Sequence, residues 1–243
     1  GFAGLPVAAL VTLLPEPRTL QAVDFANHAS ATLRDTLRHL GERRTFFIPM
    51  LTAMGGLFVV TTSLSAWFPS VFIRDHGWSG PATGYALGSV LMVSALLGNL
   101  VGGSASTWLA LRGHKDAVLR TMLVGAAVMV PCAALATTAA TPQYALGFAA
   151  PLYLAMSITF GIATLAFVEI TPPRMRGQVV SIYLLLSNLL GLSIGPPLVG
   201  VLTTSGIDVF ATVGVALAAV CLVTGLPSLL ALHRARGHYA PQS

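Results

Sequence analysis

Few side chains in this sequence could do chemistry, and those inside its apolar stretches are polar rather than charged. The candidates among them are Thr62, Trp67, Asn99, Tyr153 and Asn188. Hydroxyl, indole and amide groups hydrogen-bond to a ligand, which makes these residues candidates for a ligand pathway. An unpaired amide is costly in apolar surroundings. Asn99 and Asn188 therefore either face a polar pathway or bond one helix to another, and Trp67 either meets a ligand or anchors its helix at an interface.

Glu169 is the one carboxylate that touches an apolar stretch, and Arg174 and Arg176 follow it closely. A charge in such a segment marks a functional candidate. The alternatives here are an ion pair with these arginines or a plain interfacial residue. Cys132 and Cys221 lie inside apolar stretches, where we expect them to pack as small hydrophobic side chains. The sequence has no nucleophile elbow, phosphate-binding loop or metal-ligand motif, so we predict no enzyme, no metal site and no cofactor.

The composition determines which elements must position these residues. Of 243 residues, 55% are hydrophobic and 9% are charged, whereas soluble domains carry about 25% charged residues. The charges gather in short segments between apolar stretches of about 20 or more residues, the length that crosses a bilayer as a helix. We predict an all-α membrane protein with a six-helix bundle over residues 46–233. Its spans are expected at about 46–69, 82–108, 118–140, 145–168, 179–204 and 208–232.

The two ends of the sequence differ from the bundle in the length or the polarity of their segments. Residues 1–14 are apolar but too short to cross, so we expect the end of a truncated transmembrane helix. Residues 15–45 are too polar to cross. Apolar residues recur there at helical spacing (Phe25, Ala29, Leu33, Leu37 and Leu40), which predicts a cytoplasmic linker with an amphipathic helix, the alternative being a solvated linker. Residues 234–243 are expected to form a cytoplasmic tail.

The positive charges predict the orientation of the bundle. The net charge of +5 arises from 13 Lys and Arg residues in separate loops without interleaved aromatics, which argues against nucleic-acid binding. If the six spans are right, 12 of these 13 residues fall on one side and only Arg74 falls on the other. The positive-inside rule makes the crowded side cytoplasmic and places the carboxyl terminus there.

The second and fifth spans resemble each other. Residues 91–102 align with residues 184–195 without gaps, pairing Ser94 with Ser187, Gly98 with Gly191 and Gly102 with Gly195. These spans run in opposite directions, so the bundle is predicted to consist of two inverted three-helix repeats. Glycines at this spacing let helices approach closely. The helix-packing candidates are Gly98, Gly191, Gly195 and Pro196.

Several segments together resemble a known family. Residues 171–183 and 191–200, with Trp67-Phe-Pro-Ser70 and residues 74–79, are similar to the carboxyl-terminal half of major facilitator superfamily transporters, and within it to the bacterial spinster-like branch. The resemblance covers nearly the whole chain. It implies half of a twelve-helix fold, a missing amino-terminal six-helix half, and a small organic solute with or without a coupling ion. It also implies a multi-pass protein of the bacterial inner membrane.

The resemblance implies a cytoplasmic gate as well. Family members usually carry a Gly-Gly…Asp-Arg…Arg latch after the eighth helix. Here Gly102 and Gly103 are kept and Arg112 remains, but Thr107 and Trp108 stand in place of the Asp-Arg pair. The gate candidates are Gly102, Gly103, Arg112, Glu169, Arg174 and Arg176.

The function expected from the resemblance is transport by alternating access. The scattered hydroxyls and amides favour an amphipathic or lipid-like solute, because a phosphate or dicarboxylate would need inward arginines or lysines. Two alternatives stay open. One is a non-transporting scaffold, receptor-like derivative or inactive truncated half, which the lost Asp-Arg pair favours. The other is a membrane-embedded enzyme whose catalytic residues come from elsewhere.

Overall fold

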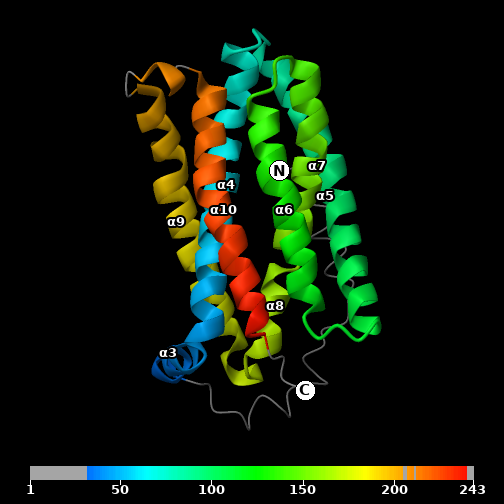
Figure 1. Cartoon of the computed structure of the whole chain (residues 1–243), viewed down its shortest axis with the longest axis vertical. Helices are drawn as coiled ribbons and strands as arrows, with labels where there is room; N and C mark the ends of the chain where they lie inside the picture. Colours follow the sequence, from blue (N-terminus) through cyan, green and yellow to red (C-terminus); the bar gives the residue numbers. More distant parts are fainter. Residues whose placement is uncertain (1–31, 205–206, 211, 240–243) are drawn as a thin grey trace, which may run out of the picture.

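The computed structural model describes residues 32–204, 207–210 and 212–239, and in this part of the chain the regular elements are all helices (Figure 1). Six spans are long and apolar enough to cross a membrane, so the predicted all-α six-helix fold is confirmed. The expected helix end at 1–14, and Phe25 and Ala29 of the amphipathic pattern, lie outside the described residues. The helices are α3 (Leu33–Glu42), α4 (Arg44–Arg74), α5 (Gly80–Leu111), α6 (Ala117–Thr137), α7 (Pro142–Gly161), α8 (Ala163–Ile170), α9 (Arg176–Thr204) and α10 (Val213–Gly237), with short 3-10 turns at Pro173–Met175 and Asp208–Phe210.

The fourth span is broken, whereas the sequence predicts one helix over 145–168. The helix α7 ends at Gly161 and α8 begins at Ala163, with Ile162 between them at φ −105° and ψ −2°. Asn99 on α5 lies against Gly161, where a Cβ atom would collide with its Oδ1 atom. The break therefore sits where a polar side chain of another helix meets the span.

The two three-helix units exchange packing partners. The first helix of the first unit, α4, packs mainly against α9 and α10, the second and third helices of the other unit. In the same way α7 packs mainly against α5 and α6, and the two third helices, α6 and α10, pack against each other. This reciprocal pattern is the one expected for two inverted repeats, because a two-fold relation maps each contact onto its counterpart.

The repeated glycines lie at these reciprocal contacts. A methyl group on Gly98 would lie 2.5 Å from the Leu154 carbonyl oxygen on α7, and one on Gly191 would lie 3.1 Å from the Phe58 carbonyl oxygen on α4. One turn further along, Gly102 lies against Ile158 of α7 and Gly195 against Thr62 of α4. Small residues at these positions let the backbones approach, which matters in a bilayer because lipid gives helices no hydrophobic reason to associate.

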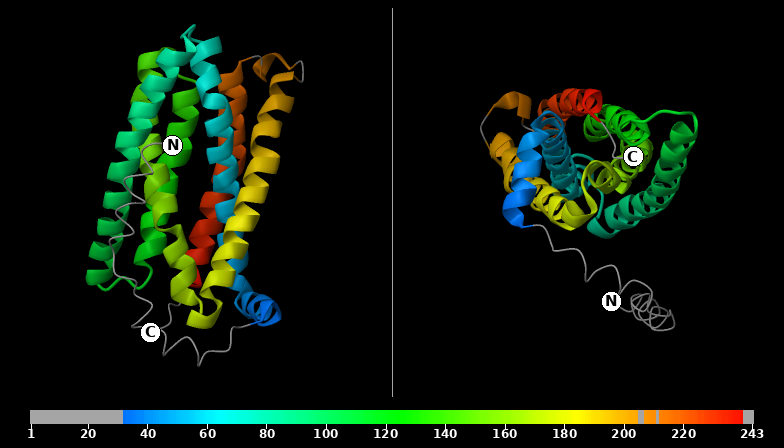
Figure 2. Two further views of the ribbon diagram at one scale, coloured as in Figure 1. Left: turned by 180° about the vertical axis from the view of Figure 1, so that it is seen from behind. Right: turned by 90° about the horizontal axis from the view of Figure 1, so that it is seen from below.

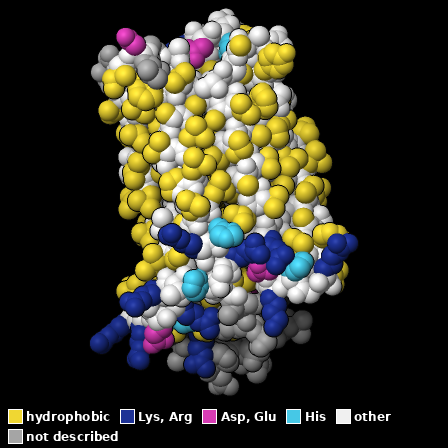
Figure 3. All heavy atoms as spheres, in the orientation of Figure 1, with side chains coloured by type: hydrophobic (Ala, Val, Ile, Leu, Met, Phe, Trp, Pro, Cys, Tyr) yellow, Lys and Arg dark blue, Asp and Glu magenta, His cyan; other side chains and the backbone are white. Residues whose placement is uncertain are grey.

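The six spans are not equally covered. From below, α5 and α9 lie at opposite flanks of the bundle, with α4 and the α7–α8 span between them (Figure 2). Only 22% of the most apolar window of α5 and 28% of that of α9 is buried, against 56% for α4. Figure 3 shows a broad hydrophobic belt with Lys and Arg side chains gathered at the end where α3 lies. The chain is therefore an integral, multi-pass membrane protein with one basic end.

Candidate functional site

Two pathway candidates on α4 are bound to the backbone of α9. The Trp67 indole Nε1 donates to the Pro196 carbonyl oxygen at 3.0 Å, and the Thr62 hydroxyl donates to the Gly191 carbonyl oxygen at 2.7 Å. Both side chains are half-buried. Their polar atoms hold α4 against α9, because carbonyl oxygens in a helix keep a second lone pair that can accept such bonds. Pro196 thereby takes part in packing through its carbonyl group.

The two asparagines are exposed on the two least covered helices. Each donates from Nδ2 to the carbonyl oxygen one turn earlier, Asn99 to Ala95 and Asn188 to Leu184, both at 2.8 Å. Each asparagine directly follows a small, buried residue of the aligned repeat, Gly98 before Asn99 and Ser187 before Asn188. The two amides therefore occupy similar faces of α5 and α9. Self-bonding leaves each carbonyl oxygen available to accept from a ligand. Tyr153 on α7 lies half-buried against the core instead.

An aromatic cluster joins the α7–α8 span to α4 and α9. Phe167 stacks on Tyr183 with ring centroids 4.4 Å apart, and Phe58 meets Phe160 edge-on at 4.9 Å. Phe58 also lies 6.5 Å from Tyr183, which connects the two pairs. Aromatic contacts therefore hold the α7–α8 span against α4 and α9, with Phe167 and Tyr183 buried in the core.

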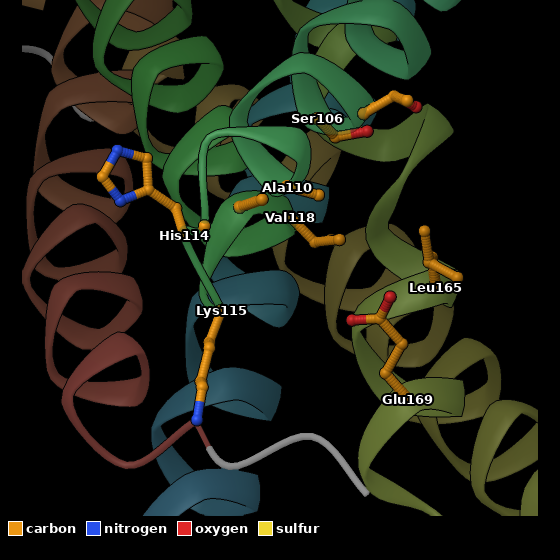
Figure 4. A pocket seen from close by; sticks show the side chains of 10 residues that line it. Ser106, Ala110, His114, Lys115, Val118, Leu165 and Glu169 are labelled. Carbon is orange, nitrogen blue, oxygen red and sulfur yellow. The ribbon is translucent and has the colours of Figure 1, made fainter. Parts of the chain in front are cut away.

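At the basic end a cleft of about 570 Å³ opens between α5, α6 and α8. Figure 4 shows Glu169 of α8 on one side of it and Ser106 of α5 on another, with Lys115 of the α5–α6 loop extending away from Glu169. The lining residues are Ser106, Thr107, Ala110, Gly113, His114, Lys115, Ala117, Val118, Leu165 and Glu169.

Glu169 is bonded to the segment that follows α10. The Tyr239 hydroxyl donates to Glu169 Oε2, and the Tyr239 ring lies 5.7 Å from that of Phe46 at the start of α4. Burial, together with the carboxylate of Glu169, raises the pKa of the Tyr239 phenol above its ordinary value of 10.0, so the phenol stays a donor at neutral pH. Among the described residues no ion pair joins Glu169 to Arg174 or Arg176.

Asp116, in the turn before α6, binds two arginines. Its Oδ1 accepts from Arg120 Nε at 2.7 Å and its Oδ2 from Arg236 Nε at 2.5 Å. Burial is the largest influence on the pKa of Asp116 and acts to raise it, but the two guanidinium bonds outweigh burial and lower it. Asp116 is therefore ionised at neutral pH and ties the start of α6 to the end of α10.

Within the described part of the chain, the remaining gate candidates do not bond to Glu169 or Asp116. The Arg112 guanidinium stacks over the Trp108 ring, 3.6 Å from its centroid, an arrangement stabilised by a cation–π interaction. Arg176 donates from Nε to the Thr171 carbonyl oxygen at 3.1 Å, and Arg174 is exposed. Gly102 lies in the contact with α7, whereas a Cβ atom on Gly103 would meet nothing within 4 Å.

Three features of the site were missed in the sequence: Gly161, Asp116 and Tyr239. The sequence signal for Gly161 was a glycine in the interior of a long apolar span, where it weakens a helix. Asp116 stands directly before a helix and four residues before an arginine, which is a common ion-pair spacing. Nothing in the local sequence around Tyr239 points to Glu169, which lies 70 residues away.

Replacing Tyr239 by Phe is expected to lower the free energy of unfolding by about 1.5–3 kcal/mol, the value of one hydrogen bond to a charged acceptor. The ring contact with Phe46 is kept, so the change isolates the bond to Glu169. Thermal unfolding in detergent measures it. Because the pKa of Tyr239 is raised on folding, the difference should be full below the ordinary value of 10.0 and decrease as pH rises above it. Tyr144→Phe, at an exposed position on α7, is the control and should change nothing.

The described residues form a membrane-spanning bundle of two inverted three-helix units, and the charged side chains lie near the ends of the spans or outside them. The profile of the Major Facilitator Superfamily matches residues 1–196, and the chain belongs to that superfamily. No curated protein matches the sequence significantly.

Two solved structures share the fold. Both are of a bacterial homologue of the human lysosomal transporter Spinster, in inward-facing conformations. The unoccupied one is 18% identical with a TM-score of 0.58 and covers 86% of this chain. The occupied one is 19% identical with a TM-score of 0.57 and covers 82%. In both cases 49% of the neighbour's chain is covered, so this chain spans about half the length of those transporters.

Proposed function

We propose that the chain is one half of a secondary transporter that moves a small organic solute across the membrane by alternating access. The observation that carries the proposal is the pair of reciprocal three-helix units whose second helices, α5 and α9, are the least covered spans. Each exposes an asparagine. A second six-helix unit packed along α5 and α9 would enclose a cavity, and inverted repeats of this kind commonly rock to expose such a cavity alternately.

The substrate that suits these surfaces is amphipathic or lipid-like. Exposed amides (Asn99 and Asn188) and scattered hydroxyls are the polar groups on α5 and α9, and neither helix exposes a charged side chain between its ends. Burying an anionic solute there would leave its charge unpaired, because the described part of the pathway faces offer no arginine or lysine. Any coupling carboxylate is proposed to come from the second half.

The basic end is proposed to face the cytoplasm, in a bacterial inner membrane. The asymmetry of Lys and Arg supports this orientation. The bonds from Asp116 to Arg236 and from Tyr239 to Glu169 would then tie the cytoplasmic ends of α6, α8 and α10 together. They would act as part of a cytoplasmic gate with the candidate residues Arg112, Arg174 and Arg176 around it.

The decisive experiment is substrate-dependent flux. The native gene product, reconstituted in liposomes, should release or accumulate a labelled amphipathic solute faster than empty liposomes. A protein that folds and shows no flux with any solute of a broad panel would be a scaffold or receptor-like derivative. The Thr107-Trp108 pair favours that alternative, because the charge latch of the family is lost there.

The intact mass of the protein extracted from its own membrane tests whether the second six-helix half belongs to the same chain. The sequence has a mass of 25.2 kDa. A roughly doubled mass would place both halves in one chain, whereas an unchanged mass would require a separate partner chain.

Asn99→Leu is expected to slow flux about fivefold, the factor that corresponds to the loss of one hydrogen bond worth about 1 kcal/mol. Leucine keeps the branched shape of asparagine but is larger and offers the solute no acceptor. The Asn99 amide donates only within its own helix among the described residues, but the side chain also packs against Gly161, so the unfolding temperature is measured beside flux to separate lost packing from a lost ligand contact. Ser104→Ala is the control: this exposed hydroxyl on α5 bonds to the Leu100 and Val101 carbonyls, and its loss should leave flux unchanged. Equal flux in the Asn99→Leu and Ser104→Ala variants would show that Asn99 is not part of the solute pathway.

A further inference from the structure

The short helix α3 lies across the bundle at its basic end. Figure 1 shows it end-on beneath α4 and α9, and the view from below in Figure 2 shows it lengthwise. Its start is fixed by a capping box, in which Asp35 N–H donates to Thr32 Oγ1 at 3.2 Å and Thr32 N–H donates to Asp35 Oδ2 at 3.1 Å. A helix in this direction runs parallel to the membrane surface rather than through it.

One side of α3 is docked on the bundle. Thr36 is fully buried, and its hydroxyl donates to Gln178 near the start of α9. The His39 ring meets Phe47 of α4 edge-on at 5.9 Å, and Leu40 packs against the core. These contacts fix which sides of the helix point away from the protein.

The sides that point away are ordered by polarity. This order runs around the circumference of the helix, at about 3.6 residues per turn. Leu33 and Leu37 lie next to the docked side. Arg34 and Arg38 come after them, and Asp35 and Glu42 come last. Leu33 is 59% exposed and Leu37 is 54% exposed. The two arginines are exposed as well. Around the helix the environment therefore changes from protein to apolar, then basic, then acidic.

This order matches the layers of a membrane surface. Acyl chains would meet the leucines, phosphate headgroups the arginines, and water the carboxylates. Three further exposed arginines lie at the starts of α4 and α9, against which α3 packs: Arg44, Arg174 and Arg176. Each basic side chain near an anionic leaflet contributes about 1 kcal/mol of attraction.

We propose that α3 is an in-plane membrane anchor that binds anionic phospholipid on the basic side of the bundle. Leu33 and Leu37 enter the acyl-chain boundary, and Arg34 and Arg38 bind the phosphate groups. Through the contact between Thr36 and Gln178 the bound leaflet supports the start of α9. This inference does not depend on transport activity.

The test uses nitroxide labels on the full chain with both native cysteines replaced (C132A and C221A). The label is placed at position 37 (L37C) or, as a reference on the acidic side, at position 35 (D35C). The protein is reconstituted in vesicles of phosphatidylcholine alone or with an equal part of phosphatidylglycerol. We expect the label at position 37 to be accessible to oxygen and shielded from a water-soluble nickel reagent in the mixed vesicles, and the label at position 35 to show the reverse.

The anionic component is tested by removing single charges. In the mixed vesicles R34Q should lower the ratio of immersed to exposed label at position 37 about fivefold, the factor equivalent to about 1 kcal/mol per arginine. Added salt should lower it too, because it screens the attraction. R74Q is the matched control, since it removes one exposed arginine at the opposite end of α4, and it should have no effect.

Two results would overturn the proposal. Equal water accessibility at positions 37 and 35 would show that α3 does not enter the leaflet. Equal immersion in both kinds of vesicle, unaffected by R34Q, would show that apolar contact alone holds the helix and that anionic lipid is not its partner. Elution of every variant as a single folded species excludes misfolding as the cause of either result.

Discussion

Gly98→Leu is expected to prevent the protein from folding into a bundle that survives extraction in detergent. A Cβ atom on Gly98 would lie 2.5 Å from the Leu154 carbonyl oxygen and 2.7 Å from Ser157 Cβ. One of these atoms belongs to the backbone of α7, so it cannot move aside as the end of a flexible side chain could. Overpacking of this kind costs about 1–3 kcal/mol or more. Separation of α5 from α7 would also remove the main packing partner of α5.

The matched control is Gly88→Leu on the same helix, where a Cβ atom would meet nothing within 4 Å. Both variants gain helix propensity relative to glycine, about 1 kcal/mol, so the difference between them isolates the contact with α7. The fraction eluting as a single species and the unfolding temperature measure it. If Gly98→Leu proved as stable as Gly88→Leu, the close approach of α5 and α7 would be wrong. Gly195→Leu, one turn beyond the counterpart of Gly98 on α9, should repeat the effect, because its Cβ atom would lie 2.9 Å from the Val59 carbonyl oxygen on α4.

Asp116→Ala is expected to lower the free energy of unfolding by about 2 kcal/mol. The change leaves the guanidinium groups of Arg120 and Arg236 without their shared acceptor, and a bond to a charged group is worth about 1.5–3 kcal/mol. Both arginines keep about one third of their side-chain surface exposed, at 33% and 32%. Solvent screening therefore keeps the expected loss well below the sum of two buried bonds.

Glu42→Ala is the control for Asp116→Ala, because it also removes an acceptor four residues from an arginine. The Arg38–Glu42 pair has 80% and 60% of its side chains exposed, and such surface pairs contribute about 0.5 kcal/mol. Thermal unfolding of the two variants should differ clearly. An equal, small loss in both would mean that the link between the start of α6 and the end of α10 contributes no more than a surface pair.

The pH dependence gives an independent check on Asp116. Its pKa is lowered from the ordinary 3.8, so folding favours the ionised form. The two bonds therefore contribute fully above that ordinary value and are lost as pH falls through the lower folded-state value. The difference in unfolding temperature between wild type and Asp116→Asn should stay constant from neutral pH down to the ordinary value and disappear only below it.

The sequence by itself determined the membrane class, the six spans and the kind of internal repeat. Hydropathy over about 20 residues is set by local composition, and a bilayer demands that such a segment become a helix because its backbone must be bonded internally. The aligned glycines at 98 and 191 also carried usable information, since small residues are rare without a packing reason in a helix. The structure places both at helix contacts.

Only the tertiary structure decided what those helices bring together. The break at Gly161 coincides with Asn99, which is 62 residues earlier (161 minus 99), and hydropathy predicted one continuous helix there. An ion pair between Glu169 and the arginines that follow it was one of two alternatives that the sequence left open, and in the structure Glu169 meets Tyr239, 70 residues further on. Asp116 and Arg236 are 120 residues apart. Local composition reports whether a segment enters the bilayer, but the partner of a polar side chain depends on helix rotation and on which helices are neighbours, and long-range packing sets both.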